Sequence, residues 1–167
     1  MQAVIDRRQL LQRCACAAFG GVAWARYSDA AGQPAPLPEM RAREAAPGCW
    51  YVEGLSALGS PANQNFISNA GFIVTSNGVV VVDALGSPAL AERLLAEIAK
   101  VTPQKVTHVV VTHYHADHVY GLQVFEKLGA RIIAHQGGRE YLFADTARLR
   151  LQASREELAP WIDDKTR

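Results

Sequence analysis

The sequence predicts an α/β protein, because runs typical of buried strands alternate with segments typical of amphipathic helices. Val79–Asp83 and Val106–Thr112 are apolar, β-branched runs. Between them, leucines recur at helical spacing after Ser87-Pro88. The length of 167 residues allows one domain.

The first strands are expected soon after residue 48. Cys49–Glu53 indicates a short strand, and Phe72–Thr75 and Val79–Asp83 flank Ser76-Asn77-Gly78. Asn-Gly between two β-branched runs predicts a hairpin, since both residues tolerate positive φ. The four consecutive valines indicate burial on both faces of their strand.

The later part of the chain is expected to alternate helix and strand. Ser87 as N-cap and Pro88 at the first helical position open a helix that Thr102-Pro103 ends. Its expected buried stripe consists of Leu90, Leu94, Leu95 and Ile98. A second helix is expected at about Asp117–Leu128, with Gly129 as its stop, followed by a strand at Arg131–Ala134. Ser154-Arg-Glu-Glu157 predicts a capping box that opens a helix before Leu158, Trp161 and Ile162.

A cluster of possible metal ligands follows the Val106–Thr112 run. His113-Tyr-His-Ala-Asp-His118 holds three of the chain's five histidines and one carboxylate. Imidazole and carboxylate are ligands that zinc and related ions favour. A turn after a strand can fold such side chains toward one point. The alternative interpretation is a polar loop in which the histidines occur by chance, and mid-strand His108 is interpreted as structural.

This hexapeptide and its context resemble the metallo-β-lactamase superfamily. The hexapeptide matches the pattern H-x-H-x-D-H. Val79–Gly86 is similar to the family's strand that ends in Asp and a Gly turn, Asn69–Thr75 to the strand before it, and Ala130–His135 to the strand after the motif. The similarity covers roughly residues 48 to 143. It implies the N-terminal half of an αβ/βα sandwich.

The resemblance also implies roles for the cluster. His113 and His115 would bind one metal ion, and Asp117 and His118 a second. Zinc is the implied cofactor, as one or two ions, with iron as the alternative. Asp117 would be the catalytic residue that orients a metal-bound hydroxide, which zinc supplies at neutral pH. Asp83 would orient a liganding imidazole, although it could instead only cap the following turn.

The sequence departs from the family pattern in two places. Tyr120-Gly121-Leu122 stands where many members have Gly-Gly-Asn, which predicts a different rim of the site. The family takes further ligands from its C-terminal half, whereas only His135 lies downstream of the motif here. The chain is therefore expected to be a truncated domain, to need the missing C-terminal half as its partner, and to have little hydrolytic activity alone.

Three functions remain open from the sequence. The first is zinc-dependent hydrolysis of a small-molecule substrate that the sequence does not identify. The second is iron-dependent oxidation of a persulfide, and the third is a non-enzymatic or inactive truncated module. The formal net charge of +1 and the scattered lysines and arginines argue against a nucleic-acid partner, which would need a basic stripe.

The N-terminus is typical of an exported protein. Asp6–Leu11 resembles a twin-arginine signal, and Ala23-Trp24-Ala25 is an A-x-A-like cleavage site. We therefore expect a signal peptide at residues 1–25, a Pro/Ala-rich linker at 26–47, a domain at 48–167 and a periplasmic location, with the cytoplasm as the alternative. The apolar stretch between the twin-arginine segment and this cleavage site is too short to span a membrane. After cleavage Cys49 alone would remain, without a disulfide partner in the chain.

Overall fold

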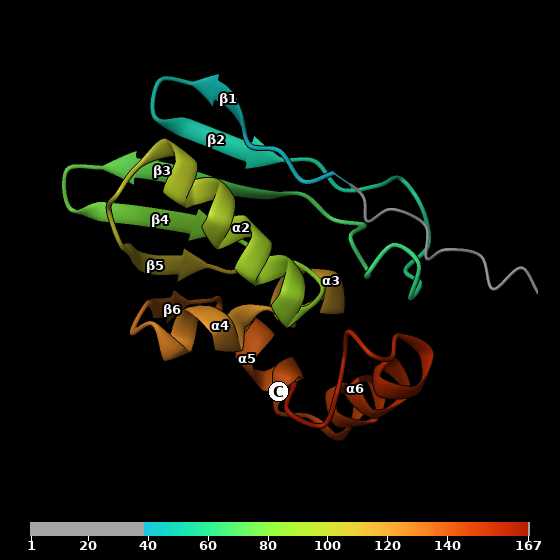
Figure 1. The fold of residues 1–167 in the computed structure, drawn as a ribbon. Helices are drawn as coiled ribbons and strands as arrows, with labels where there is room; N and C mark the ends of the chain where they lie inside the picture. The colour runs from blue at the N-terminus through green and yellow to red at the C-terminus, as the bar shows by residue number, and fades with distance from the viewer. Residues whose placement is uncertain (1–38, 167) are drawn as a thin grey trace, which may run out of the picture. The chain divides into compact units, whose positions relative to one another are not determined.

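The computed structural model describes residues 39–166, so the expected signal peptide and most of the expected linker lie outside the described residues. These residues form a six-stranded sheet in the order β1-β2-β3-β4-β5-β6 (Figure 1). The strands are β1 (Arg43–Ala46), β2 (Cys49–Val52), β3 (Ala70–Thr75), β4 (Gly78–Val82), β5 (Val106–Val110) and β6 (Arg131–Ile133). Pairing is antiparallel from β1 to β4 and parallel from β4 to β6. The expected α/β class is thereby confirmed, and β1 lies within the segment that the sequence indicated as a linker.

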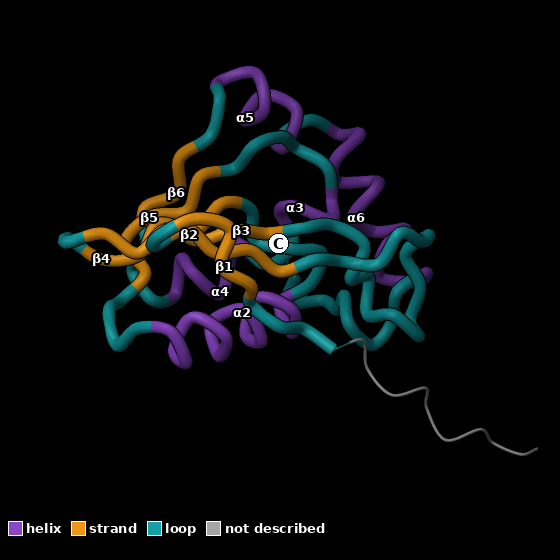
Figure 2. Tube along the Cα trace, turned by 90° about the horizontal axis from the view of Figure 1, so that it is seen from above, coloured by secondary structure: helices purple, strands orange, loops and turns teal. Residues whose placement is uncertain are grey.

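The helices lie on both sides of this sheet. They are α2 (Pro88–Val101), α3 (Ala116–Val119), α4 (Leu122–Lys127), α5 (Gln136–Leu142) and α6 (Asp145–Glu157). Figure 2 shows α2 and α4 together on one face and α5 on the other side, beyond β6. None of the helices in residues 39–166 has the length and apolar character needed to cross a membrane.

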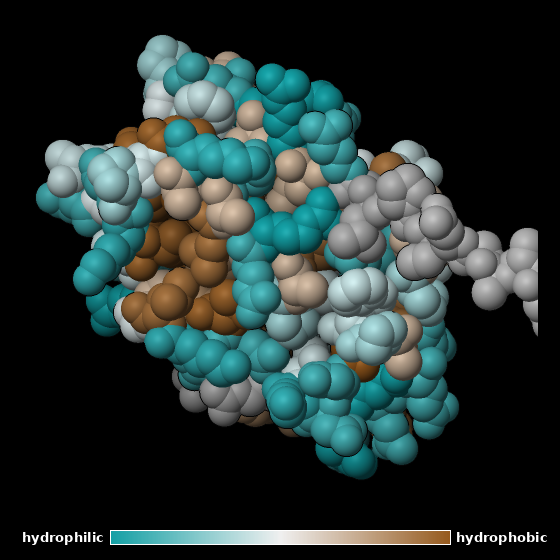
Figure 3. Space-filling model, in the orientation of Figure 1, coloured by the Kyte–Doolittle hydropathy of each residue, from teal (hydrophilic) through white to brown (hydrophobic). Residues whose placement is uncertain are grey.

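The main core fills the space between the sheet and the pair α2 and α4. Val79, Val81 and Val109 point into it from β4 and β5 and are fully buried. Leu90 and Leu94 of α2 and Phe125 of α4 meet them and are equally buried. Figure 3 shows apolar surface in the region between α2 and α4, where Leu95, Ile98, Val106 and Leu128 line an open cleft of about 390 Å³. The helical stripe predicted for α2 is therefore the side that contacts the sheet.

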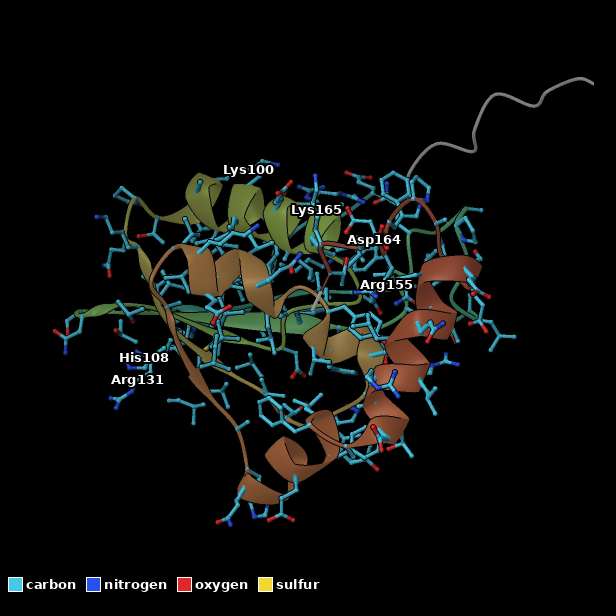
Figure 4. All side chains as sticks on the ribbon, turned by 90° about the horizontal axis from the view of Figure 1, so that it is seen from below. Lys100, His108, Arg131, Arg155, Asp164 and Lys165 are labelled. Carbon is cyan, nitrogen blue, oxygen red and sulfur yellow. The ribbon has the colours of Figure 1, made fainter. Side chains whose placement is uncertain are left out.

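The opposite face of the sheet is only partly covered within residues 39–166. Val80 and Val82 alternate with the buried valines of β4 and are half-buried, and Ile73 and Ile133 are 38% and 46% exposed. Figure 4 shows His108 and Arg131, which pair across β5 and β6, on this face. The expected burial of all four valines on both faces is therefore wrong for the described residues. The reason is that α2 and α4 both pack on the same side.

The predicted hairpin and the predicted caps of α2 are confirmed. Thr75 pairs with Gly78 across a turn of Ser76 and Asn77, and Gly78 takes φ +118°. Among these turn residues Gly78 alone has positive φ, whereas the sequence pattern allowed it for Asn77 as well. The Ser87 side chain accepts a hydrogen bond from the Leu90 amide at 3.3 Å, and Pro88 opens α2.

The single helix expected at about Asp117–Leu128 is instead two short helices, α3 and α4. The end of α3 and the residues that follow it bond to the loop after β4: the Ala84 amide donates to the His118 carbonyl at 2.8 Å, and the Gly121 amide to the Leu85 carbonyl at 3.2 Å. A Cβ at Gly121 would lie 2.0 Å from the Ala84 carbonyl oxygen, so only glycine fits. The helix is therefore interrupted by tertiary hydrogen bonds, and Gly129 at φ +81° follows α4 as predicted.

The predicted capping box at Ser154–Glu157 is wrong. The helix begins at Asp145 and ends at Glu157, so Ser154 lies in its last turns. Ser154 is buried, and its hydroxyl lies 3.3 Å from that of Tyr120. After the helix, Leu158 and Ile162 pack in a second apolar cluster with Val111 and Val119. A tertiary contact, and not an N-cap, thus explains the serine.

Candidate metal centre

The loop between β5 and α3, together with α3 itself, carries the predicted ligands. His113 and His115 lie in this loop, and Asp117 and His118 lie in α3, which starts at Ala116. The ring centroids of His113 and His115 are 4.6 Å apart, and those of His113 and His118 are 4.1 Å apart. The turn after β5 thus brings the three imidazoles together.

His118 lies between two carboxylates. Its Nδ1 donates to Asp83 Oδ2 at 2.8 Å, and its Nε2 lies 3.4 Å from Asp117 Oδ2. Asp83 directly follows β4 and takes φ +64°, a conformation unusual for a residue with a side chain. This backbone turn places the Asp83 carboxylate, which is buried, beneath the motif loop.

Thr112 links the same carboxylate to His113, a role that the sequence analysis missed. The Thr112 amide donates to Asp83 Oδ1 at 2.9 Å, and the Thr112 hydroxyl donates to Asp83 Oδ2 at 2.7 Å. Because that hydroxyl proton is used, the hydroxyl oxygen accepts from His113 Nδ1, which is 2.9 Å away. This arrangement leaves the lone pair of His113 on Nε2, the nitrogen available to a metal. The only sequence signal was the position of Thr112 directly before the first histidine.

Ser68 supports the start of α3, and it was also missed. Its side chain is buried and donates to the backbone carbonyl of Asp117. The Ala84 amide bonds to the carbonyl of the next residue, His118. Two loops far apart in sequence therefore hold the backbone of the ligand-bearing turn. Nothing in the local pattern around Ser68 marks this contact.

The electrostatics of the cluster follow from these contacts. Hydrogen bonds to Asp117 and to Asp83 raise the pKa of His118 to about 9. The bond from His118 lowers the pKa of Asp117 despite partial burial. Burial raises the pKa of Asp83, but the bonds from His118 and Thr112 outweigh it and leave that pKa lowered. Without a metal, the pair of carboxylates thus holds a positive imidazolium, the kind of charge that a bound cation could replace.

The donor set fits zinc or iron in its chemistry. Three imidazoles and a carboxylate are the nitrogen and oxygen ligands that both ions accept. Within residues 39–166, however, no group of three or more His, Cys, Asp or Glu side chains already surrounds one ion position. The His115 side chain is exposed and the other three are half-buried.

The remaining histidines and Cys49, the cysteine within residues 39–166, lie elsewhere. His135 follows β6 and, with His113 and Tyr114, lines a cleft of about 320 Å³. Its Nδ1 accepts a hydrogen bond from the Gly137 amide at 3.1 Å. His108 lies on the partly covered face of the sheet, with Nδ1 3.1 Å from the Thr107 hydroxyl. Cys49 is a free, half-buried thiol on β2.

Solved structures with a similar fold are metallo-β-lactamases and a sulfatase. The metallo-β-lactamase from Erythrobacter litoralis is 24% identical, with a TM-score of 0.51 over 63% of this chain and 45% of that chain. The one from Hirschia baltica is 16% identical, with a TM-score of 0.51 over 72% and 50%. A stereoselective inverting sec-alkylsulfatase from Pseudomonas sp. is 22% identical, with a TM-score of 0.53 over 70% and 18%. The chain thus spans at most half the length of these proteins.

A search of curated proteins gave no match at the significance required. The sequence model of one family, described as the metallo-beta-lactamase superfamily, matches residues 64–165. This range contains β3 to α6 and the complete ligand cluster, and it covers more than half of the chain. The chain belongs to the metallo-beta-lactamase superfamily.

Proposed function

We propose that this chain supplies the metal-binding motif of a zinc-dependent hydrolase that acts on a small molecule. The observation that carries the proposal is the convergence of His113, His115 and His118 at the end of β5, beside Asp117. Polar side chains crowded at the edge of a core cost free energy unless hydrogen bonds, opposite charges or a metal ion compensate them. A bound metal ion would supply this compensation.

Each residue of the cluster has a task in this proposal. Bound zinc lowers the pKa of its water ligand and so supplies a nucleophile at neutral pH. His113 and His115 would hold one ion, and Asp117 and His118 a second. The lowered pKa of Asp117 keeps its carboxylate ionised, so it can accept a hydrogen bond from the attacking water and orient it. Asp83 and Thr112 would keep the imidazoles of His118 and His113 turned toward the ions.

We further propose that additional ligands come from a C-terminal half of the same fold. The cluster offers two residues to each ion, whereas a catalytic zinc usually has three protein ligands. The half-buried Val80 and Val82 and the exposed Ile73 and Ile133 form an apolar sheet face on which a second layer could pack. The proposed partner is therefore part of the same protein.

The test is metal analysis of the full-length protein, purified without chelator. We expect zinc in the wild type and its loss in the double variant His113→Ala/His115→Ala. His108→Ala is the matched control, because His108 lies within β5, before the motif loop, with its Nδ1 beside the Thr107 hydroxyl, and should leave the metal content unchanged. Iron in place of zinc would favour the alternative function, the oxidation of a sulfur compound, over hydrolysis. Equal metal content in the wild type and the double variant would contradict the proposal.

A further inference from the structure

We propose that the cleft beside His115 and Asp117 binds the non-reacting part of the substrate, and that this part is an apolar arm ending in an anion. This inference rests on the proposed hydrolase function, which it makes more specific. The cleft has a volume of about 660 Å³ and is lined by residues of the motif loop, α3, α5 and α6. That volume is within the range of ordinary small-molecule sites.

Aromatic and aliphatic side chains form the walls of the cleft. The rings of Tyr114 and Tyr141 lie 3.9 Å apart, and Tyr114 meets His115 edge-on at 5.3 Å. Leu142 and Leu151 lie behind them and are half-buried in the second apolar cluster. Tyr114 stands within the motif, so an apolar group against its ring lies directly beside a proposed metal ligand. The walls therefore suit an aryl or alkyl group attached near the bond that is cleaved.

Two guanidinium groups give the cleft its charge. Arg148 and Arg150 line it from α6, and Asp117 is the only carboxylate among its described lining residues. Arg148 Nε lies 3.6 Å from Asp145 Oδ1, and Arg150 Nη1 lies 3.9 Å from Glu157 Oε2. Both distances exceed those of a good hydrogen bond, and exposed pairs of this kind contribute little.

The two arginines can therefore exchange their surface carboxylates for a ligand anion. A guanidinium binds a carboxylate or sulfonate through two parallel hydrogen bonds, and more strongly next to an apolar wall than in open water. Asp117, the one acidic group among the described residues that line the cleft, belongs to the proposed metal site and would be neutralised by a bound cation. Charge complementarity thus points to a substrate with an anionic group at the end of its apolar arm.

Binding of a fluorescent anion to the metal-free full-length protein tests the cleft independently of catalysis. The probe is 8-anilinonaphthalene-1-sulfonate, and the neutral probe is N-phenyl-1-naphthylamine, which has the same rings without the sulfonate. In Arg148→Gln/Arg150→Gln we expect the Kd of the anion to rise at least about fivefold, with that of the neutral probe unchanged. Phe143→Ser, a change at a lining residue that is 81% exposed, should weaken both probes.

The matched control is Lys127→Gln/Arg131→Gln, which removes the same charge from α4 and β6 and touches no lining residue of this cleft. The proposal is overturned if the anion binds the Arg148/Arg150 variant as tightly as the wild type, or if the control weakens it equally. It is also overturned if Phe143→Ser leaves both affinities unchanged.

A second measurement separates this proposal from the hydrolase function. The zinc-loaded full-length protein is assayed with 4-nitrophenyl hydrogen adipate and with its neutral methyl ester. We expect a lower KM for the anionic ester, and loss of that preference in Arg148→Gln/Arg150→Gln. If His113→Ala/His115→Ala keeps the zinc content of the wild type although the sulfonate still binds through the arginines, the hydrolase proposal fails and anion binding in the cleft stands. Equal KM values for the two hydrolysed esters would overturn the cleft proposal alone.

Discussion

Asp83 and His118 are joined by a hydrogen bond of 2.8 Å between Oδ2 and Nδ1, although 35 positions separate them in the sequence. The same carboxylate also accepts from the amide and the hydroxyl of Thr112. One buried acidic side chain therefore orients His118 directly and His113 through Thr112. The ligand cluster depends on the loop after β4 as much as on its own hexapeptide.

Replacing Asp83 with Asn should weaken metal binding without removing a ligand. The amide has one acceptor oxygen in place of two, so it cannot keep all three hydrogen bonds from His118 and Thr112, and the imidazoles lose part of their orientation. We expect a loss of zinc affinity of about 10- to 100-fold, typical of such orienting partners. Competition with a chromophoric chelator measures it. Asp164→Asn, in an exposed turn near Arg155 (Figure 4), is the control. Unchanged zinc affinity in Asp83→Asn would refute the orienting role.

The stability of the metal-free protein should depend on the ionisation of His118. The pKa of His118 is raised from 6.5 to about 9. The protonated imidazole therefore stabilises the fold fully below about pH 6.5, and this stabilisation is lost as the pH rises through 9. The pKa values of Asp83 and Asp117 are lowered from 3.8, so their contribution is present above that pH and is lost as the pH falls. The free energy of unfolding, measured by denaturant titration, should therefore decline between pH 6.5 and 9. His118→Asn should flatten that decline, and an unchanged profile in this variant would count against the assignment.

Gly121→Ala should destabilise the fold. The added Cβ would lie 2.0 Å from the Ala84 carbonyl oxygen and 2.7 Å from the Ala91 Cβ, so the Ala84 backbone, which bonds to His118 of α3, would have to shift. We expect a cost of about 1–3 kcal/mol, as for other overpacked positions, in thermal or urea unfolding. Gly138→Ala is the control, because a Cβ there meets nothing within 4 Å. Equal stability of the two variants would show that the junction relaxes.

Export should remove the N-terminal segment. The Arg7-Arg8 pair and the Ala23-Trp24-Ala25 site predict a mature protein that begins near Arg26. Sequencing the N-terminus of protein from periplasmic and cytoplasmic fractions of the native host measures this. Arg7→Lys/Arg8→Lys is the matched variant, because it keeps the charge and should retain the precursor in the cytoplasm. A soluble cytoplasmic protein that keeps Met1 would contradict export.

The 167-residue chain alone should have little hydrolytic activity. With two ligands for each ion, zinc should bind weakly and exchange readily. Thioester, lactone, β-lactam and phosphodiester substrates are assayed with zinc added, with Asp117→Ala as the control. Multiple turnovers that depend on zinc and disappear in Asp117→Ala would show that this half of the ligands suffices.

Local patterns in the sequence determined much of the secondary structure of this protein and the place of its ligand cluster. The periodicity of Leu90, Leu94 and Ile98, the Ser87-Pro88 start and the turn before Gly78 each depend on neighbours in the chain, so the sequence predicts them correctly. The ligand hexapeptide is also local. It could be recognised because its residues and the preceding strand are contiguous.

Tertiary contacts decided the rest. Gly121 interrupts a helix whose periodicity is continuous, because its amide bonds to Leu85 and a Cβ would strike Ala84. The sequence pattern predicts that Ser154 is an N-cap, but Ser154 is buried against Tyr120 in the last turns of α6. Such contacts join segments tens of residues apart, and their energies override local propensity. Asp83 lies in a positive-φ turn and bonds to His118. The sequence alone therefore predicts which residues are the ligands, whereas packing between distant loops determines how they are oriented.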